Sequence, residues 1–429
     1  LQAVTKNPMV PKSVRRDDWP TGLDIAVMAR ACSNAGDEGE HVLERGLRMI
    51  ENGDRRRVLI DISEIAHFDK RTGIQRVARN FCVELAAIGR ATGRFNVEPF
   101  VWTETGIQYA RDFARTALSM ECQGGNGEVE SCPSDLVFML DPSWWLPERY
   151  DEFHYRTWQL GGEVVWMVHD LVPIKYPQTC DPGLPPAFRE WLTYIVRTAD
   201  GFICNSEATR ADLEWFIDGI ERTGRRRPWL RSVHLGSDLD PNFPGEPGEI
   251  ALKVLKRVGG RPYFATLGTL EPRKDYGTVL DAFEGLWNQG ADIALVMIGK
   301  RGWNIKELAK RIEQHRENGS RLFWLESATD GDVHCFLKTA TALIQASIAE
   351  GFGLPVVEAG SLGVPLLLSD ISVFHEIAGD DAVYFPVGAS EILASIISQF
   401  LQSNEWKHPR GIKAMTWQES AAKLADVLI

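Results

Sequence analysis

Short apolar runs, each followed by a turn and then a helical pattern, recur along most of this chain of 429 residues. The first half contains RVLIDI at 57–62 and EVVWMV at 163–168, and the second contains PYFATLG at 262–268 and TALIQA at 341–346. Such runs are typical of parallel strands that are buried on both faces and covered by helices. The pattern therefore predicts an α/β protein with two doubly wound, Rossmann-like domains that face one cleft.

A stretch rich in proline and glycine, LDPNFPGEPGE at 239–249, interrupts this alternation and is the best candidate for a connection between domains. The chain before the first strand is polar and irregular, and the chain after the last strand contains an amphipathic pattern around Trp417. The predicted parts are an N-terminal extension at 1–54, a first domain at 55–240, a linker at 241–260, a second domain at 261–405 and a C-terminal helix at 406–429.

Composition excludes several classes of protein. The formal net charge of −12 argues against a general nucleic-acid-binding protein. No apolar run reaches the roughly 18 residues that a membrane-spanning helix needs, and no signal peptide stands out in the first part of the chain. The seven cysteines are scattered without a C-x-x-C pair or zinc spacing, which suits free thiols in a reducing compartment. We therefore expect a cytoplasmic protein.

Two glutamates, Glu350 and Glu358, bracket a glycine-rich turn in the sequence EGFGLPVVE. The turn follows an apolar run and precedes a helical pattern, so unpaired N–H groups and the positive end of a helix dipole should meet there. An anion or a hydroxyl-rich ligand fits such a place, and Gly351 and Gly353 permit close approach of the backbone. Glu358 could accept two hydrogen bonds from a diol such as ribose. The alternative is a tight turn with two surface glutamates.

Two other predicted strands end in residues with functional side chains. EVVWMV is followed by His169 and Asp170, and PYFATLG is followed by a loop that contains the adjacent cations Arg273 and Lys274. Functional side chains in open α/β sheets gather at the carboxyl ends of the strands. The alternatives are a structural histidine partnered by Asp170 and a pair of exposed loop cations.

The glutamate motif and the sequence TLEPRKD resemble the signature of the retaining nucleotide-sugar glycosyltransferases of family four, which have the two-domain GT-B fold. The resemblance covers nearly all of residues 57–429, with looser matches in the first half. It implies a hexosyltransferase that moves a sugar from a nucleoside diphosphate donor to a hydroxyl of a saccharide or lipid-linked saccharide, with retention. It also implies that the first domain, 55–240, holds the acceptor, that the second domain, 261–405, holds the nucleotide-sugar donor, and that the C-terminal helix crosses back onto the first domain. Mannose from GDP-mannose is the predicted sugar, in polysaccharide or glycolipid biosynthesis.

The resemblance further implies roles for individual residues. Arg273 and Lys274 would hold the donor diphosphate, Glu350 would hold the sugar hydroxyls, and His169 would contact the transferred sugar. Many family members carry arginine where this chain has Thr269, so Arg273 would have to compensate for a missing cation. The predicted donor-binding residues are Gly73, Gly299, Phe352, Gly353, Leu354 and Glu358.

Stabilisation of the departing diphosphate is the main chemical demand of such a reaction. Arg273, Lys274, the N–H of Gly73 and the helix after Gly353 could supply it, so no metal and no cofactor is expected. Two alternatives stay open: a nucleotide-sugar 2-epimerase, and a catalytically silent sugar- or nucleotide-binding scaffold. The basic stretch RTGRRRPWLR at 222–231 is predicted to be a solvated loop, with peripheral contact to an anionic membrane as its alternative.

Overall fold

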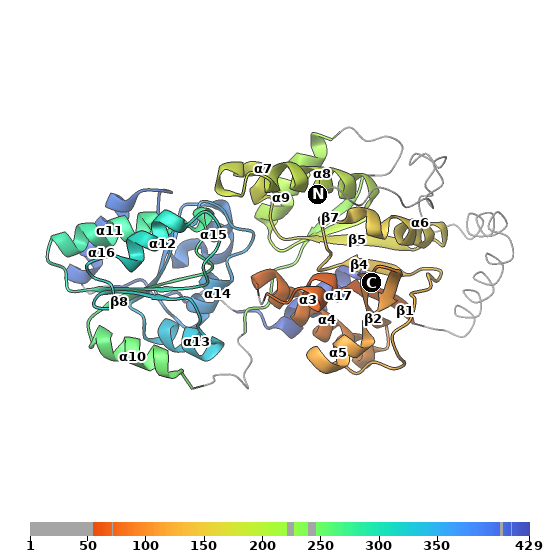
Figure 1. Ribbon diagram of the computed structural model, residues 1–429, viewed down its shortest axis with the longest axis horizontal. Helices are drawn as coiled ribbons and strands as arrows, with labels where there is room; N and C mark the ends of the chain where they lie inside the picture. Colours follow the sequence, from red (N-terminus) through yellow and green to blue (C-terminus); the bar gives the residue numbers. More distant parts are fainter. Residues whose placement is uncertain (1–54, 71, 221–226, 239–245, 404–405, 413) are drawn as a thin grey trace.

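Two sheets, each covered by helices, organise the chain (Figure 1). The computed structural model describes residues 55–70, 72–220, 227–238, 246–403, 406–412 and 414–429. The predicted N-terminal extension at 1–54 and the first part of the predicted basic loop lie outside the described residues. Within these ranges, no helix has both the length and the apolar character needed to cross a lipid bilayer.

The first sheet has seven strands in the order β3-β2-β1-β4-β5-β6-β7. Its strands are β1 (Arg56–Asp61), β2 (Phe95–Thr103), β3 (Gly106–Tyr109), β4 (Leu136–Met139), β5 (Glu163–Val168), β6 (Gly201–Cys204) and β7 (Trp229–Ser232). Its helices are α3 (Ser63–His67), α4 (Gly73–Thr92), α5 (Arg111–Ala117), α6 (Asp151–Gln159), α7 (Val172–Lys175), α8 (Leu184–Thr198) and α9 (Glu207–Asp218).

Two features of this sheet correct the sequence-based expectations. β3 pairs antiparallel with β2, so the sheet is not entirely parallel. β7 occupies the end of the segment that was predicted to be a solvated basic loop, and it pairs with β6. The Trp229 ring lies against Gly201, where an added Cβ would come within 2.0 Å of the ring. Trp229 therefore contributes to sheet packing at this edge.

The second sheet has six parallel strands in the order β10-β9-β8-β11-β12-β13. Its strands are β8 (Tyr263–Leu267), β9 (Ala294–Ile298), β10 (Leu322–Leu325), β11 (Ala342–Gln345), β12 (Leu366–Ser369) and β13 (Val383–Phe385). Its helices are α10 (Glu249–Val258), α11 (Tyr276–Asn288), α12 (Lys306–Glu313), α13 (Asp330–Thr339), α14 (Leu354–Ser361), α15 (Ser372–Ala378) and α16 (Ser390–Ser403).

Helix α10 lies inside the segment predicted to be a linker, 241–260. Ala251 and Val258 of α10 are buried in a cluster with strand residues of the second sheet, including Tyr263. The second half of the predicted linker is therefore part of the second domain. The proline- and glycine-rich composition just before Glu249 concealed this helix, whose sequence EIALKVLKRV is amphipathic.

The last helix, α17 (Trp417–Leu428), lies on α4 of the first domain although it follows the second domain in sequence (Figure 1). Trp417 is 4% exposed, and its ring meets that of Phe81 edge-on at a centroid distance of 5.7 Å. Leu424 and Leu428 are buried in the same cluster. A capping box closes the start of α17, since Thr416 and Glu419 exchange side-chain and backbone hydrogen bonds. The C-terminal segment therefore completes the core of the first domain.

Replacing Trp417 by alanine should destabilise the first domain by about 3–5 kcal/mol, because it removes a large buried ring from that core. Thermal or urea unfolding followed by circular dichroism measures this loss. Trp215→Ala is the matched control, since Trp215 lies on α9 of the same domain and is 60% exposed. Equal unfolding midpoints for the two variants would contradict a stabilising role for α17.

Candidate functional site

The carboxyl edges of the two sheets meet at the glycine turn after β11. The backbone of Gly351 lies so close to the first domain that an added Cβ would be 1.8 Å from the His169 carbonyl oxygen. The hydroxyl groups of Ser206 and Thr209 donate to the Gly351 carbonyl at 2.6 and 3.1 Å. Only glycine permits this approach, so the turn that carries the glutamate motif also joins the domains.

A buried ion cluster lies beside this contact. Glu350 accepts from Arg273 at 2.7 Å, from the Ser347 hydroxyl at 2.7 Å, and from Lys274. Arg273 also pairs with Glu271. Burial acts to raise the pKa of Glu350, but Arg273 and Lys274 outweigh it and hold the pKa at about 2. Glu350 is therefore ionised across the physiological range and fixes the two cations in place.

Two neighbouring carboxyl groups have pKa values that are shifted upward, in the opposite direction to that of Glu350. Burial raises the pKa of Glu271 and of Asp170 above their ordinary values, in spite of the nearby Arg273. Desolvation penalises the charged form of any carboxyl group, and these two lack the close double pairing that Glu350 has. The cluster therefore combines one strongly ionised carboxylate with two carboxyl groups that are easier to protonate.

Glu358 lies across the domain boundary from Arg76. The two side chains form an ion pair of 2.6 Å between α14 and α4, and Glu358 is 4% exposed. Arg76 stands one turn into α4, whose first residue is Gly73. A ribose that uses Glu358, as predicted, would share this carboxylate with Arg76 or displace it.

His169 follows β5, and its ring is not hydrogen-bonded to the Asp170 carboxylate. The Asp170 carboxylate accepts instead from the backbone N–H of Val172 at 3.0 Å. The Nε2 atom of His169 is buried and has no hydrogen-bond partner among the described residues. Burial lowers the pKa of His169 to about 4, against a hydrogen bond with the Leu140 backbone that acts to raise it. The ring is therefore neutral at pH 7, and its Nε2 atom is a buried polar atom without a partner among the described residues.

Two of the remaining predicted residues, Gly73 and Gly353, stand at the starts of helices, and the others pack against neighbouring residues. Gly73 is the first residue of α4, and an added Cβ there would meet nothing within 4 Å. Gly353 is the N-cap of α14 and has a left-handed backbone with φ of 97°. Gly299 packs against the Gly268 carbonyl, where an added Cβ would come within 1.8 Å. Phe352 is 5% exposed and meets the His234 ring edge-on at 5.5 Å. Gly299 and Phe352 thus have structural roles, their donor-binding role stays a prediction, and Leu354 is half-buried against the first-domain core.

The motif analysis did not identify Glu376, which also joins the domains. Its carboxylate accepts from the backbone N–H groups of Glu207 and Ala208, at 2.7 and 2.9 Å, and so caps α9 from the other domain. It also pairs with His234 at 2.6 Å. No local sequence pattern marks this residue, because its partners lie more than 100 positions earlier in the chain.

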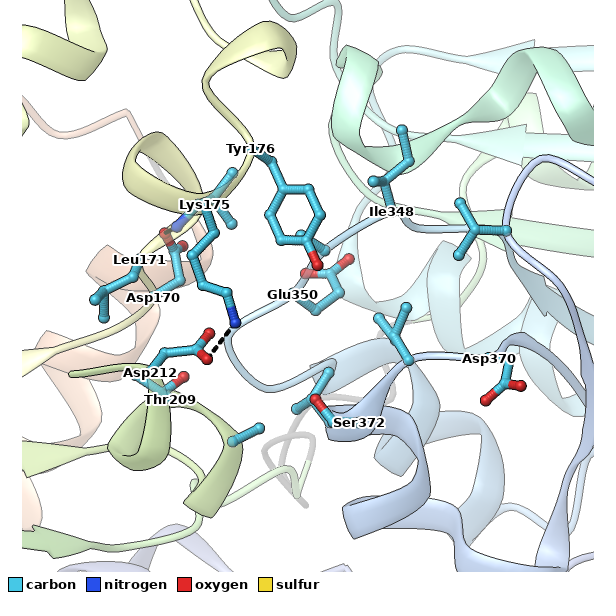
Figure 2. A pocket seen from close by; sticks show the side chains of 16 residues that line it. Asp170, Leu171, Lys175, Tyr176, Thr209, Asp212, Ile348, Glu350, Asp370 and Ser372 are labelled. Atoms are coloured by element: carbon cyan, nitrogen blue, oxygen red, sulfur yellow. Dashed lines mark hydrogen bonds and ion pairs between the residues drawn. The ribbon is translucent and has the colours of Figure 1, made fainter. Parts of the chain in front are cut away.

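A cavity of about 380 Å³ lies beside Glu350 and is lined by residues of both domains. Figure 2 shows Tyr176 of the first domain extending toward Glu350, with Asp370 and Ser372 across the opening. Lys175 forms an ion pair with Asp212 of α9. The cavity therefore presents charged and hydroxyl groups from both domains next to the ion cluster.

Known proteins share this two-domain fold. Sucrose-phosphate synthase from Thermosynechococcus elongatus matches with a TM-score of 0.61 at 16% identity, covering 87% of this chain and 98% of that one. HepE of Anabaena, solved in complex with UDP and glucose, matches with a TM-score of 0.55 at 16% identity, covering 87% and 95%. The fold is the two-domain GT-B fold of glycosyltransferases, as predicted.

Sequence comparison gives the family. Residues 249–421 match the family described as "Glycosyl transferases group 1". The chain is 33% identical over 381 residues to the serotype-specific mannosyltransferase WbdA of Escherichia coli, covering 85% of this chain and 45% of WbdA. O-antigen chain mannosyltransferase B of Escherichia coli is 29% identical over 191 residues, 42% of this chain and 49% of that protein. The match over residues 249–421 identifies a group 1 glycosyltransferase domain in this chain, and the chain spans about half the length of these curated relatives.

Replacing Glu350 by glutamine should destabilise the protein by about 3 kcal/mol or more at pH 7, because two buried cations lose their counter-charge. The folded-state pKa of about 2 lies below the ordinary 4.5, so Glu350 contributes its full stabilisation above pH 4.5 and loses it as the pH falls toward 2. The gap between wild type and variant should therefore narrow over this range, as urea unfolding at several pH values would measure.

Glu249→Gln is the control for this measurement. Glu249 forms an ion pair with Lys253, but its side chain is 80% exposed, and exposed pairs contribute only about 0–1 kcal/mol. A Glu350→Gln enzyme as stable as Glu249→Gln at pH 7 would contradict the account of the buried cluster.

Proposed function

We propose that this chain is a retaining hexosyltransferase that moves mannose from GDP-mannose to a hydroxyl of a saccharide or lipid-linked saccharide. The observation that carries the proposal is the meeting of His169, the glutamate turn and the Arg273–Lys274–Glu350 cluster at one junction of the two sheets. The names of the two mannosyltransferases reported above support mannose as the sugar. Polysaccharide biosynthesis is the setting that fits an O-antigen mannosyltransferase relative.

Charge stabilisation is the chief task of this site. As the bond between sugar and diphosphate breaks, negative charge grows on the leaving group, and fixed cations stabilise it without first having to reorganise. Lys274 is 9% exposed and is held by Glu350, so its position is set before the donor arrives. The N-termini of α4 and α14 add the positive ends of two helix dipoles from opposite sides of the domain boundary.

Donor recognition would fall to residues around these groups. The free Nε2 atom of His169 can form a hydrogen bond with a hydroxyl of the transferred sugar. The ribose would approach Glu358, and Arg76, released from that carboxylate, would lie near the N-terminus of α4 and could turn toward the diphosphate. No metal and no cofactor enters this scheme, in which the acceptor attacks from the side of the leaving group.

A nucleotide-sugar 2-epimerase is the alternative that one observation favours. Asp170 lines the cavity beside Glu350, and burial raises its pKa, so its carboxyl group is a candidate for proton exchange with a substrate. Incubation with GDP-mannose and other nucleotide sugars, with and without manno-oligosaccharides, separates the two reactions. Release of nucleoside diphosphate that depends on the acceptor supports transfer, whereas a new sugar nucleotide formed without acceptor supports epimerisation. The same assay with EDTA tests metal independence.

Replacing Lys274 by alanine should lower turnover by about 100-fold or more, as does loss of one fixed donor in other enzymes that stabilise developing charge. Binding of the nucleotide sugar, measured by calorimetry, should change less, because charge on the diphosphate is largest in the transition state. Lys253→Ala on α10 is the control, since the Lys253 side chain is 67% exposed. Near-normal turnover of Lys274→Ala would remove this residue from the mechanism.

Replacing Gly73 by valine should reduce turnover without lowering the thermal unfolding midpoint. An added Cβ meets no protein atom within 4 Å, so only a ligand that approaches the backbone would feel the new side chain. Gly351→Ala is the contrasting variant, because its Cβ would collide with the His169 carbonyl and disturb the contact between domains. A fully active Gly73→Val enzyme would refute a donor contact at the start of α4.

A further inference from the structure

Three aromatic side chains gather at the carboxyl edge of the first sheet, beyond the groups assigned to the donor. Phe68 and Trp145 are 45% and 44% exposed, and their ring centroids lie 6.1 Å apart. Trp102 is half-buried beside them, and the His67 ring lies 4.7 Å from it. Single exposed apolar residues are ordinary on protein surfaces, but exposed rings in mutual contact at a functional edge call for a ligand or a partner. We call Phe68, Trp102 and Trp145 the aromatic platform.

The platform is held by the protein rather than displayed on a loose loop. Trp144, next to Trp145, packs edge-on against Trp191 of the core at 6.2 Å. The Trp102 indole N–H donates to the Ser143 hydroxyl at 2.6 Å, and Ser143 donates to Glu64 at 2.5 Å. These contacts fix Trp102 and the loop that carries Trp145 before any ligand binds, which reduces the entropy cost of binding.

The topology places the platform in line with the reaction centre. Phe68 follows β1 and Trp145 follows β4, while His169 follows β5, and these three strands are parallel neighbours in that order. His169 is hydrogen-bonded to the backbone of Leu140, at the start of the loop that carries Trp145. The ends of β5 and β1 are two strand spacings apart, about 10 Å in all, and Phe68 lies beyond the short helix α3 that follows β1. That is the reach of a short oligosaccharide rather than of one sugar.

The platform also borders the second domain. The backbone carbonyl of Lys70, two residues beyond Phe68, accepts from the Lys300 ammonium group at 3.1 Å, and Lys300 follows β9 of the second sheet. A ligand lying on the rings can therefore run along the first domain toward the junction that holds His169 and Glu350.

The chemistry of the platform matches a saccharide. A pyranose ring presents a face of C–H groups, which packs on an aromatic ring, and a rim of hydroxyls, which needs hydrogen-bond partners. Arg149 lies over the Trp102 ring at 4.5 Å and is exposed, and Glu64 and His67 stand beside the same rings. An anionic bilayer fits less well, because carboxylates accompany the basic side chains here: Glu64 is linked to Trp102 through the Ser143 hydroxyl, and Asp69 is paired with Arg79.

We propose that the aromatic platform binds the non-reacting sugars of an oligosaccharide acceptor, and so selects an extended glycan over a single sugar. The direction of the bound glycan toward His169 rests on the proposed function, whereas the binding of the glycan to the platform does not. The platform adds a saccharide site of the first domain to the donor site of the second. The platform then determines how strongly the protein prefers long acceptors to short ones.

Equilibrium binding without any donor tests this proposal. Methyl α-mannoside and mannotetraose, with gluco- and galacto-tetrasaccharides for comparison, are titrated into the full chain by calorimetry. Mannotetraose should bind at least about tenfold more tightly than the monosaccharide. The double variant Phe68→Ala/Trp145→Ala should lose about tenfold in tetrasaccharide affinity, so that the preference for length largely disappears.

Two further variants make the result specific. Trp215→Ala removes an exposed tryptophan of the same domain and should bind mannotetraose as the wild type does. Trp145→Phe keeps an aromatic face and should retain most of the affinity, which separates loss of stacking from damage to the fold. In the same variants, kcat/KM for mannotetraose should follow the measured affinities, while the monosaccharide should be affected much less.

Several outcomes would overturn the proposal. They are the failure of every tetrasaccharide to bind, equal affinities for the double variant and Trp215→Ala, and a defect of the double variant only in binding phosphatidylglycerol vesicles. The last result would assign the rings to a membrane. Failure of sugar transfer with every nucleotide sugar, with length-dependent binding intact, would refute the proposed function and leave the platform standing. Normal sugar transfer, with equal binding of short and long acceptors, would support the proposed function and refute the role of the platform.

Discussion

The buried carboxylate of Glu350 is the interaction on which the rest of the site depends. Moving two cations out of water costs several kcal/mol each unless a partner replaces their hydration. Glu350 provides that partner for Arg273 and Lys274 at once, and burial strengthens each attraction. The result is a pair of cations held at the boundary between the sheets, where a leaving group would need them.

The residue after Glu350 is glycine, and this glycine sets the contact with the first domain. Gly351 brings the second domain against the His169 carbonyl, and its own carbonyl accepts hydrogen bonds from two hydroxyl groups of the first domain. Glu376 and the pair of Arg76 with Glu358 add polar contacts across the same boundary. Apolar contacts accompany these polar ones, since Phe352 is buried in the first-domain core and Leu354 packs against it.

Local patterns in the sequence predicted much of the fold. Continuous apolar runs marked strands such as β5 and β11, because parallel strands are buried on both faces. The exceptions have local causes. β3 is a four-residue edge strand in a hairpin, and α10 follows directly on a stretch rich in proline and glycine. Short edge elements bury few side chains and therefore leave little periodicity to detect.

For the site, the sequence by itself determined which residues stand at strand ends and helix starts, since those positions follow from local periodicity and turn chemistry. His169, Arg273, Lys274 and Glu350 were all found in this way. Only the tertiary structure decided their partners: Glu350 lies with the cations, and Glu358 meets Arg76, which is 282 positions away. The alignment of Phe68 and Trp145 with His169 likewise needed the order of the strands. Charge pairing and stacking depend on distances in space, and a local pattern contains no such distances between segments that folding brings together.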